Sequence, residues 1–263
     1  MLLGSQRAKQ VIRRATKDTE RLRILLAGES TTGKTTSLMT IPSALRACGI
    51  ESPRIIVADF DQGSDELLNH SEFEVYRFGG IPGSDPETYP AAAYWLEKEL
   101  PADKEPINVF VTDSITALSM SIMATVAKDN GRLGKPAQLQ DWNVEMQATQ
   151  KWVLDMQNLP VTHAVISICH TYLEKDDLSG RAYNELVLTG KLPSKLVRLF
   201  PEIYFAHKGT GKTPVFKWQN VPDVQTSART MIPKFRDPKG IDQDFTPIFR
   251  EWFSMKGGEK SGE

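Results

Sequence analysis

The stretch 23–36, RILLAGESTTGKTT, decides how this chain folds. Its first five residues are an apolar run typical of a buried strand, and residues 35–47 predict a helix. Between them, residues 28–35 match the pattern G-x-x-x-x-G-K-[ST] at every fixed position. Glycines let such a loop turn its backbone N–H groups toward phosphate oxygens, and the start of the following helix adds a partial positive charge. The sequence therefore predicts a phosphate-binding loop.

This loop also predicts which side chains meet a nucleoside triphosphate. Lys34 is expected to reach the β- and γ-phosphates, and the Thr35 hydroxyl is expected to bind Mg²⁺. The residues expected to hold the nucleotide are Gly28, Glu29, Ser30, Thr31, Thr32, Gly33, Lys34, Thr35 and Thr36. A second run of similar letters, GTGKT at 209–213, has Ala206 where the first glycine is required and is followed by Pro214. We interpret that second run as a hairpin turn.

Short apolar runs alternate with helical patterns along the chain. Strands are predicted at 23–27, 54–60, 74–78, 107–112 and 164–169, and helices at 35–47, 91–100, 114–128 and 141–159. This alternation predicts an α/β fold with a mostly parallel sheet and helices on both faces. Short later strands are expected at 203–207, 215–219 and 229–232, and residues 171–189 are expected to form a long polar loop.

Two of the helices carry further expectations. Pro42 is expected to kink or end the first helix, because proline lacks a backbone N–H. In the helix at 141–159, Asp141 is expected to cap the N-terminus. Large apolar residues recur there at steps of three and four, beginning at Trp142, and this stripe is expected to face the core.

Composition and charge limit the domain organisation and the function. The chain has 263 residues, 40% of them hydrophobic, and a formal net charge of -1, which excludes a polycation that coats nucleic acid by charge alone. Residues 1–23 are locally basic, with seven basic and two acidic side chains. We expect a basic arm or helix at 1–20, one core at 21–255 and a disordered tail at 256–263.

Location is predicted from what the sequence lacks. No run approaches 18 apolar residues, and the N-terminus does not read as a signal peptide. Cys48 and Cys169 are expected to be buried free thiols. The chain is therefore expected to be cytoplasmic and to have no membrane partner.

Acidic residues follow two of the predicted strands. Asp113 ends the strand at 107–112 and is expected to hold Mg²⁺ through water, whether or not it also caps the next helix. Asp59 and Asp61 end the strand at 54–60, which we expect to lie beside the phosphate loop. Asp61 has cleared the apolar run and is the better candidate for the base that activates water, although either could be a solvated loop acid.

His170 ends the strand at 164–169, at the rim where the carboxyl ends of parallel strands meet. An imidazole there could hydrogen-bond the γ-phosphate. It could then transmit the departure of that phosphate to the following loop. A purely structural role for this histidine stays open.

The run 107–118, INVFVTDSITAL, and the phosphate loop resemble the RecA-type ATPase core. The polar residue ending the later strand is usually Gln in RecA itself and is His170 here, as in the shorter phage-type RecA-like ATPases of single-strand annealing and recombination. The stretches 189–192 (TGKL) and 234–236 (KFR) are similar to that branch as well. The resemblance implies a RecA-like P-loop NTPase core that uses ATP and Mg²⁺.

The same resemblance implies roles for residues outside the loop. Asp61 would activate the attacking water, and the segments 129–140 and 171–189 would face DNA. Lys234 and Arg236 would reach across to the γ-phosphate held by a neighbouring copy in a ring or filament.

The expected function is an ATPase that assembles on single-stranded DNA and promotes annealing or strand exchange, in the host cytoplasm if the chain is phage-encoded. Two alternatives stay open: a ring-forming nucleic-acid motor or helicase with the same core, and a nucleotide-dependent switch that binds proteins. The sequence does not decide between DNA, RNA and protein as the partner, and it does not give the number of subunits.

Overall fold

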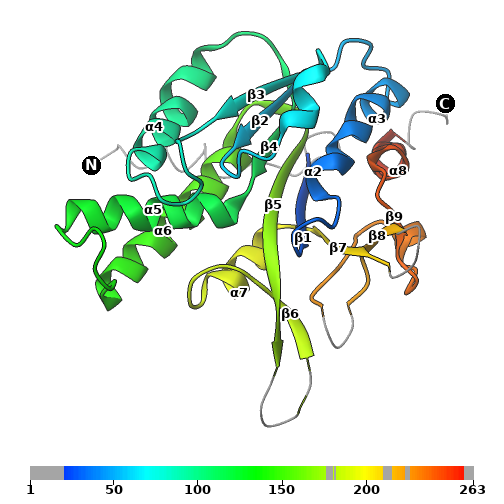
Figure 1. The fold of residues 1–263 in the computed structure, drawn as a ribbon. Helices are drawn as coiled ribbons and strands as arrows, with labels where there is room; N and C mark the ends of the chain where they lie inside the picture. The colour runs from blue at the N-terminus through cyan, green and yellow to red at the C-terminus, as the bar shows by residue number, and fades with distance from the viewer. Residues whose placement is uncertain (1–20, 176–179, 181, 210–214, 223–225, 258–263) are drawn as a thin grey trace, which may run out of the picture.

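The computed structural model describes residues 21–175, 180, 182–209, 215–222 and 226–257. These residues form a nine-stranded sheet flanked by helices (Figure 1). The strands are β1 (Leu22–Gly28), β2 (Ile55–Asp59), β3 (Phe73–Arg77), β4 (Ile107–Asp113), β5 (Val161–Lys175), β6 (Ala182–Leu186), β7 (Glu202–Lys208), β8 (Phe216–Gln219) and β9 (Ile241–Asp242). Strands β3-β2-β4-β5-β1-β7 run parallel in that order, and β8 and β9 continue the sheet antiparallel. The predicted α/β fold, with a mostly parallel sheet and late antiparallel strands, is confirmed.

The central strand β5 lies between β1 and β4. Strands β5 and β4 separate β2 from β1, so the strand expected beside the phosphate loop is not the sheet neighbour of the strand that leads into this loop. The carboxyl ends of these strands still share one rim. Gly28 pairs in register with His170, and Asp59 pairs with Asp113.

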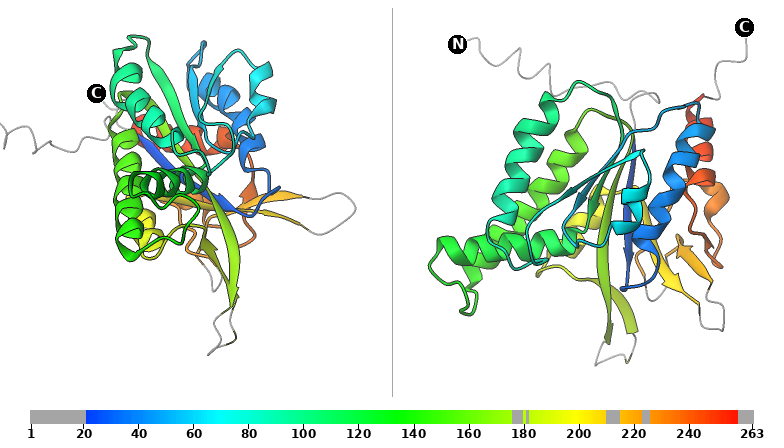
Figure 2. Two further views of the ribbon diagram at one scale, coloured as in Figure 1. Left: turned by 60° about the vertical axis from the view of Figure 1, so that its left-hand side comes forward. Right: turned by 45° about the horizontal axis from the view of Figure 1, so that its top comes forward.

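Helices cover both faces of the sheet (Figures 1 and 2). They are α2 (Lys34–Ser37), α3 (Ile41–Ala47), α4 (Thr88–Tyr94), α5 (Ile115–Asp129), α6 (Leu139–Asn158), α7 (Leu192–Leu196) and α8 (Phe245–Gly257). Helices α4 to α7 pack on one face, where Leu118 and Trp152 meet Phe110 of β4. Helices α3 and α8 pack on the other face, where Leu45 and Phe249 meet Val109. Successive residues of β4 thus enter opposite cores, as strand geometry requires.

The first helix is interrupted near Pro42, as expected. A 3₁₀ turn at Leu38–Thr40 separates α2 from α3, and Pro42 occupies the first turn of α3. Proline is tolerated there because the first N–H groups of a helix have no partner inside the helix.

The segment 171–189 differs from the predicted loop. Strand β5 runs on through His170 to Lys175 and pairs antiparallel with β6, so that Tyr172 lies opposite Glu185 and Leu173 opposite Asn184. The resulting β5–β6 hairpin projects from the rim of the sheet (Figure 1). Polar and apolar residues mix on both of its half-exposed faces, which is why no clear strand pattern marks it.

Other boundaries also differ from those predicted. The strand expected at 229–232 is a single bridge between Ile203 and Arg229. Helix α6 begins at Leu139, with Gln138 at the N-cap and Asp141 completing the capping box from the third helical position. The start of the expected core stripe is wrong too, because Trp142 is 39% exposed.

Some expectations concern the chain ends and the thiols. The sequence did not predict α7, α8 or β9. Helix α8 reaches Gly257, inside the predicted tail, while residues 1–20 and 258–263 lie outside the described residues.

Cys169 is buried as expected, but Cys48 is only partly buried. Within the described ranges, no helix is both long and apolar enough to cross a membrane.

Candidate active site

The phosphate loop follows β1 and begins where two strands pack closely. A Cβ on Gly28 would lie 2.6 Å from the carbonyl oxygen of Ala206 on β7, so only glycine fits. Gly33 precedes α2 with φ of 83°, and Thr31 has φ of 64°. The left-handed conformation of Gly33 is one that glycine adopts without strain, which explains the second glycine of the motif.

Lys34 is buried at the base of the loop, with 5% of its surface exposed. Its ammonium donates to the carbonyl oxygens of Gly28 at 2.9 Å and Glu29 at 2.7 Å. Burial lowers the pKa of Lys34, while the nearby Asp113 and Asp61 act in the opposite direction. The amino group is thus positioned by the loop itself before any nucleotide binds.

Thr35 and Asp113, the two residues expected to hold Mg²⁺, contact each other directly. The Thr35 hydroxyl donates to Oδ2 of Asp113 at 2.6 Å, and Asp113 is 1% exposed. Burial raises the pKa of Asp113 to about 7, against the opposing effect of the Thr35 hydrogen bond. Helix α5 is capped by Ser114, whose Oγ accepts from the backbone N–H of Ala117, so Asp113 does not serve as its cap.

These two oxygens fit Mg²⁺. It prefers oxygen ligands and is bound by one or two carboxylates together with phosphates and water. Among the residues that the structure describes, no group of three or more His, Cys, Asp or Glu side chains could hold a metal ion by itself. Thr35 and Asp113 would hold the ion, which supplies positive charge against the phosphate oxygens.

Asp61 and His170 contact each other in the cavity that Thr35 and Asp113 also line. Their Oδ2 and Nε2 atoms are 2.8 Å apart. Both residues line this cavity of about 290 Å³ with Lys34, Thr35 and Asp113, and it is called the phosphate cavity below. The sequence predicted each residue separately, and the structure brings all five together. The other ring nitrogen of His170, Nδ1, is buried and has no hydrogen-bond partner among the described residues.

Asp59 has a different environment from Asp61. It is fully buried and accepts hydrogen bonds from the backbone N–H groups of Gly63 and Ser64, at 3.3 and 3.2 Å. Arg77 forms an ion pair with it at 3.4 Å. These bonds hold the turn after β2, and Asp59 does not line the cavity that contains Asp61.

Lys234 and Arg236 do not line the phosphate cavity of their own chain. Both side chains are exposed, around a 3₁₀ turn at Pro233–Phe235, and Lys234 forms an ion pair with Glu251 of α8. The structure therefore places both side chains on the surface, outside the set of residues that line this cavity.

Gln243 is a further residue at the phosphate loop that no sequence pattern indicates. Its Nε2 donates to the carbonyl oxygens of Thr32 at 2.8 Å and Lys217 at 3.1 Å, which ties the phosphate loop to β8. A Cβ on Gly33 would lie 2.6 Å from its Oε1. No sequence signal could have found this contact, because it joins positions 211 residues apart and a single glutamine forms no motif.

The chain matches a known protein family over most of its length. A family model described as AAA domain matches residues 20–230. A crystal structure of a KaiC-like protein from the hyperthermophilic archaeon Pyrococcus horikoshii is similar at 13% identity and a TM-score of 0.40, covering 88% of this chain and 98% of that one. No curated protein gives a significant match. The family match and the geometry of the phosphate loop together show that this chain belongs to the AAA domain family of P-loop ATPases.

Proposed function

We propose that this chain hydrolyses ATP with Mg²⁺ and binds single-stranded DNA, promoting annealing or strand exchange. The observation that carries the proposal is the hydrogen bond between Asp61 and His170. Both residues line the phosphate cavity, and His170 also belongs to the strand that continues into the β5–β6 hairpin. A single contact therefore connects the place of hydrolysis with a projecting element.

The proposed chemistry follows from the positions of the side chains. Lys34 neutralises charge on the β- and γ-phosphates, and Thr35 and Asp113 hold Mg²⁺. Asp61 accepts a proton from the attacking water as the water oxygen bonds to the γ-phosphorus and the bond to the leaving ADP oxygen breaks. His170 orients the Asp61 carboxylate through Nε2.

The hairpin is the proposed DNA-facing element. Tyr172 and Tyr183 are 43% and 37% exposed, on the same face of the hairpin, and exposed aromatic rings can stack with unpaired bases. When the γ-phosphate leaves, the hydrogen-bonded side chains of Asp61 and His170 no longer have a phosphate group beside them. We propose that this change alters the position of the hairpin and thereby the grip on DNA.

A ring or filament completes the proposal. The chain is close to neutral, so each copy brings few phosphate contacts, and several copies on one strand multiply them. The exposed Lys234 and Arg236 are available to a neighbouring copy. We propose that they act on the γ-phosphate held by that neighbour.

One observation favours a second function. The tyrosine face of the hairpin also carries Glu174 and Glu185, and the Tyr172 hydroxyl donates to Glu185 at 3.2 Å. Carboxylates repel a phosphate backbone, so this face also suits a protein partner of a nucleotide-dependent switch. The motor or helicase alternative has no such support.

Binding of a fluorescent oligonucleotide distinguishes these functions. We expect the purified chain to bind single-stranded DNA tightly with a non-hydrolysable ATP analogue, weakly with ADP, and to leave duplexes unwound while speeding the annealing of complementary strands. Duplex unwinding would instead identify a motor. Absence of DNA binding in every nucleotide state would contradict the proposal and leave the protein-binding switch.

A further inference from the structure

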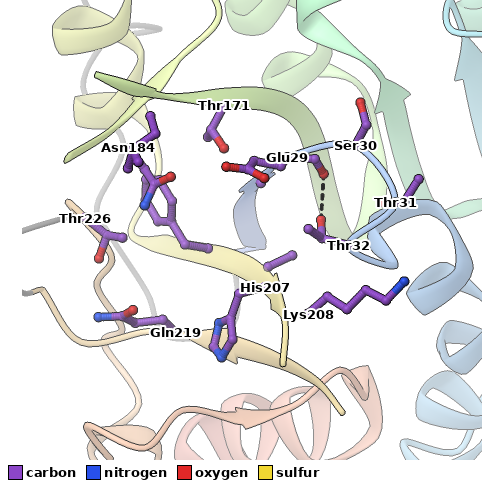
Figure 3. A pocket seen from close by; sticks show the side chains of 14 residues that line it. Glu29, Ser30, Thr31, Thr32, Thr171, Asn184, His207, Lys208, Gln219 and Thr226 are labelled. Atoms are coloured by element: carbon purple, nitrogen blue, oxygen red, sulfur yellow. Dashed lines mark hydrogen bonds between the residues drawn. The ribbon is translucent and has the colours of Figure 1, made fainter. Parts of the chain in front are cut away.

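A second and larger cavity lies on the other side of the phosphate loop. Its volume is about 580 Å³, against about 290 Å³ for the phosphate cavity, and Ser30 and Thr31 line both. Cavities of about 300–1,000 Å³ are typical of small-molecule sites. Its walls come from the phosphate loop, the β5–β6 hairpin, and strands β7 and β8 (Figure 3). Gly28, Glu29 and Thr32, which were expected to hold the nucleotide, line this cavity and not the smaller one.

The interior of this cavity carries neutral polar groups and one acid. Figure 3 shows the Glu29 carboxylate, the Asn184 amide and the Thr171 hydroxyl directed toward its middle. Among the residues that the structure describes, neither the carboxylate of Glu29 nor the amide of Asn184 has a side-chain hydrogen bond. Lys34 and Thr32 bond to Glu29 only through its backbone oxygen. Both side chains are therefore available to a ligand.

The carboxylate restricts the ligand chemistry. It repels a phosphate group from the interior but accepts a hydrogen bond from an amino group, as carboxylates do with N4 of cytosine. An asparagine amide pairs with an amino group and an adjacent ring nitrogen, as in its contacts with adenine. The two groups together favour a base that presents an exocyclic amino group, which cytosine and adenine have and thymine lacks.

The rim of the cavity carries a cation. Lys208 is exposed at the end of β7, and its ammonium lies 5.7 Å from the centre of the Phe216 ring. A strand whose base enters the cavity would leave its phosphates near this rim, where cations favour them. The acidic interior and basic rim thus match the two ends of one nucleotide.

We infer that this cavity binds one unstacked, amino-bearing base of the single strand, with Glu29 and Asn184 reading its edge. The inference rests on the proposed single-stranded DNA binding. Because Thr171 directly follows His170 and Ser30 and Thr31 line both cavities, the base and ATP contact the same elements. Each ligand is then expected to tighten the binding of the other by the same factor.

The test compares two oligonucleotides of equal length, oligo(dC) and oligo(dT), in anisotropy titrations at pH 8 with a non-hydrolysable ATP analogue. The parent protein should bind oligo(dC) about tenfold or more tighter than oligo(dT), since a good contact to a base edge discriminates by roughly that factor. Asn184→Ala should reduce this ratio toward one. Asn158→Ala, which removes the same group from the exposed end of α6, should keep the parent ratio.

Glu29→Gln provides a second, nearly isosteric variant whose backbone bonds to Lys34 and Thr32 can remain. It should also lower the ratio. Tight but equal binding of both oligonucleotides by the parent, or a parent-like ratio in folded Asn184→Ala and Glu29→Gln, would overturn the base-reading role and leave the proposed function standing. Failure of both oligonucleotides to bind would overturn the proposed function and this inference together.

Discussion

Asp59 and Asp61 are two residues apart and have different environments. We expect Asp61→Asn to bind ATP normally and to lower turnover by about 100-fold or more, because the proton of the attacking water then has no acceptor. Asp59→Asn should instead lower the free energy of unfolding by about 1–2 kcal/mol, because a buried carboxylate that holds a turn and an arginine is lost. Steady-state ATPase rates and denaturant unfolding of both variants check this. Normal turnover in Asp61→Asn would place the base elsewhere.

At the residue scale, the sequence predicts best where the chemistry dictates residue types in consecutive positions. Lys34 and Thr35 are recognisable because a phosphate loop needs a cation and a hydroxyl directly after its second glycine. The contact of Asp61 with His170 could not be derived, since it depends on the side-chain directions at the ends of different strands. Gln243 was beyond prediction, because its partner Thr32 is brought near only by the whole sheet.

Glu145 in α6 couples the stability of an element to pH. It is fully buried, its Oε1 accepts from the hydroxyls of Ser119 and Thr149, and its Oε2 has no partner among the described residues. Burial raises its pKa above the ordinary value of 4.5. The folded chain therefore holds this proton more tightly than the unfolded chain, and stability falls as pH rises from 4.5 toward the raised pKa.

Replacing this carboxyl should remove that loss. We expect Glu145→Gln to have a free energy of unfolding about 1 kcal/mol above the parent near pH 8 and little advantage near pH 4. Urea unfolding at several pH values measures the difference. The exposed Glu51→Gln serves as the control and should follow the parent at every pH. A Glu145→Gln variant that is less stable than the parent near pH 8 would show that the carboxylate itself stabilises the helix pair.

At the element scale, strands β1, β2 and β4 were predictable because they are buried on both faces of the sheet. The β5–β6 hairpin was not, because its outer part from Tyr172 to Lys175 is mostly exposed and obeys no burial pattern. The place of β2 in the sheet could not be predicted either. The order of apolar runs along the chain does not tell that β4 and β5 lie between β2 and β1. Helix α8 went unpredicted although it covers one face of the sheet.

At the scale of the whole molecule, assembly into a ring or filament predicts that mixing two inactive variants restores ATPase activity. Lys34→Ala lacks the loop cation but keeps Arg236, whereas Arg236→Ala keeps an intact loop. If Arg236 acts on a neighbour, an equal mixture should recover about a quarter of the parent ATPase rate, because random pairing places an intact loop beside an intact arginine in one interface of four. Mixing Lys34→Ala with Asp113→Asn gives the control, since both lesions lie in the same site. A mixture with Arg236→Ala that stays inactive would contradict action between subunits.

The central claim is that ATP hydrolysis is coupled to single-stranded DNA through His170, and ATPase rates with and without single-stranded DNA test it most directly. His163→Ala is the matched control, because that histidine lies near the opposite end of the same strand, β5. We predict that DNA stimulates the parent and His163→Ala alike, while His170→Ala keeps part of its basal rate and loses the stimulation. Equal stimulation of the parent and His170→Ala, or no stimulation of the parent, would contradict the claim.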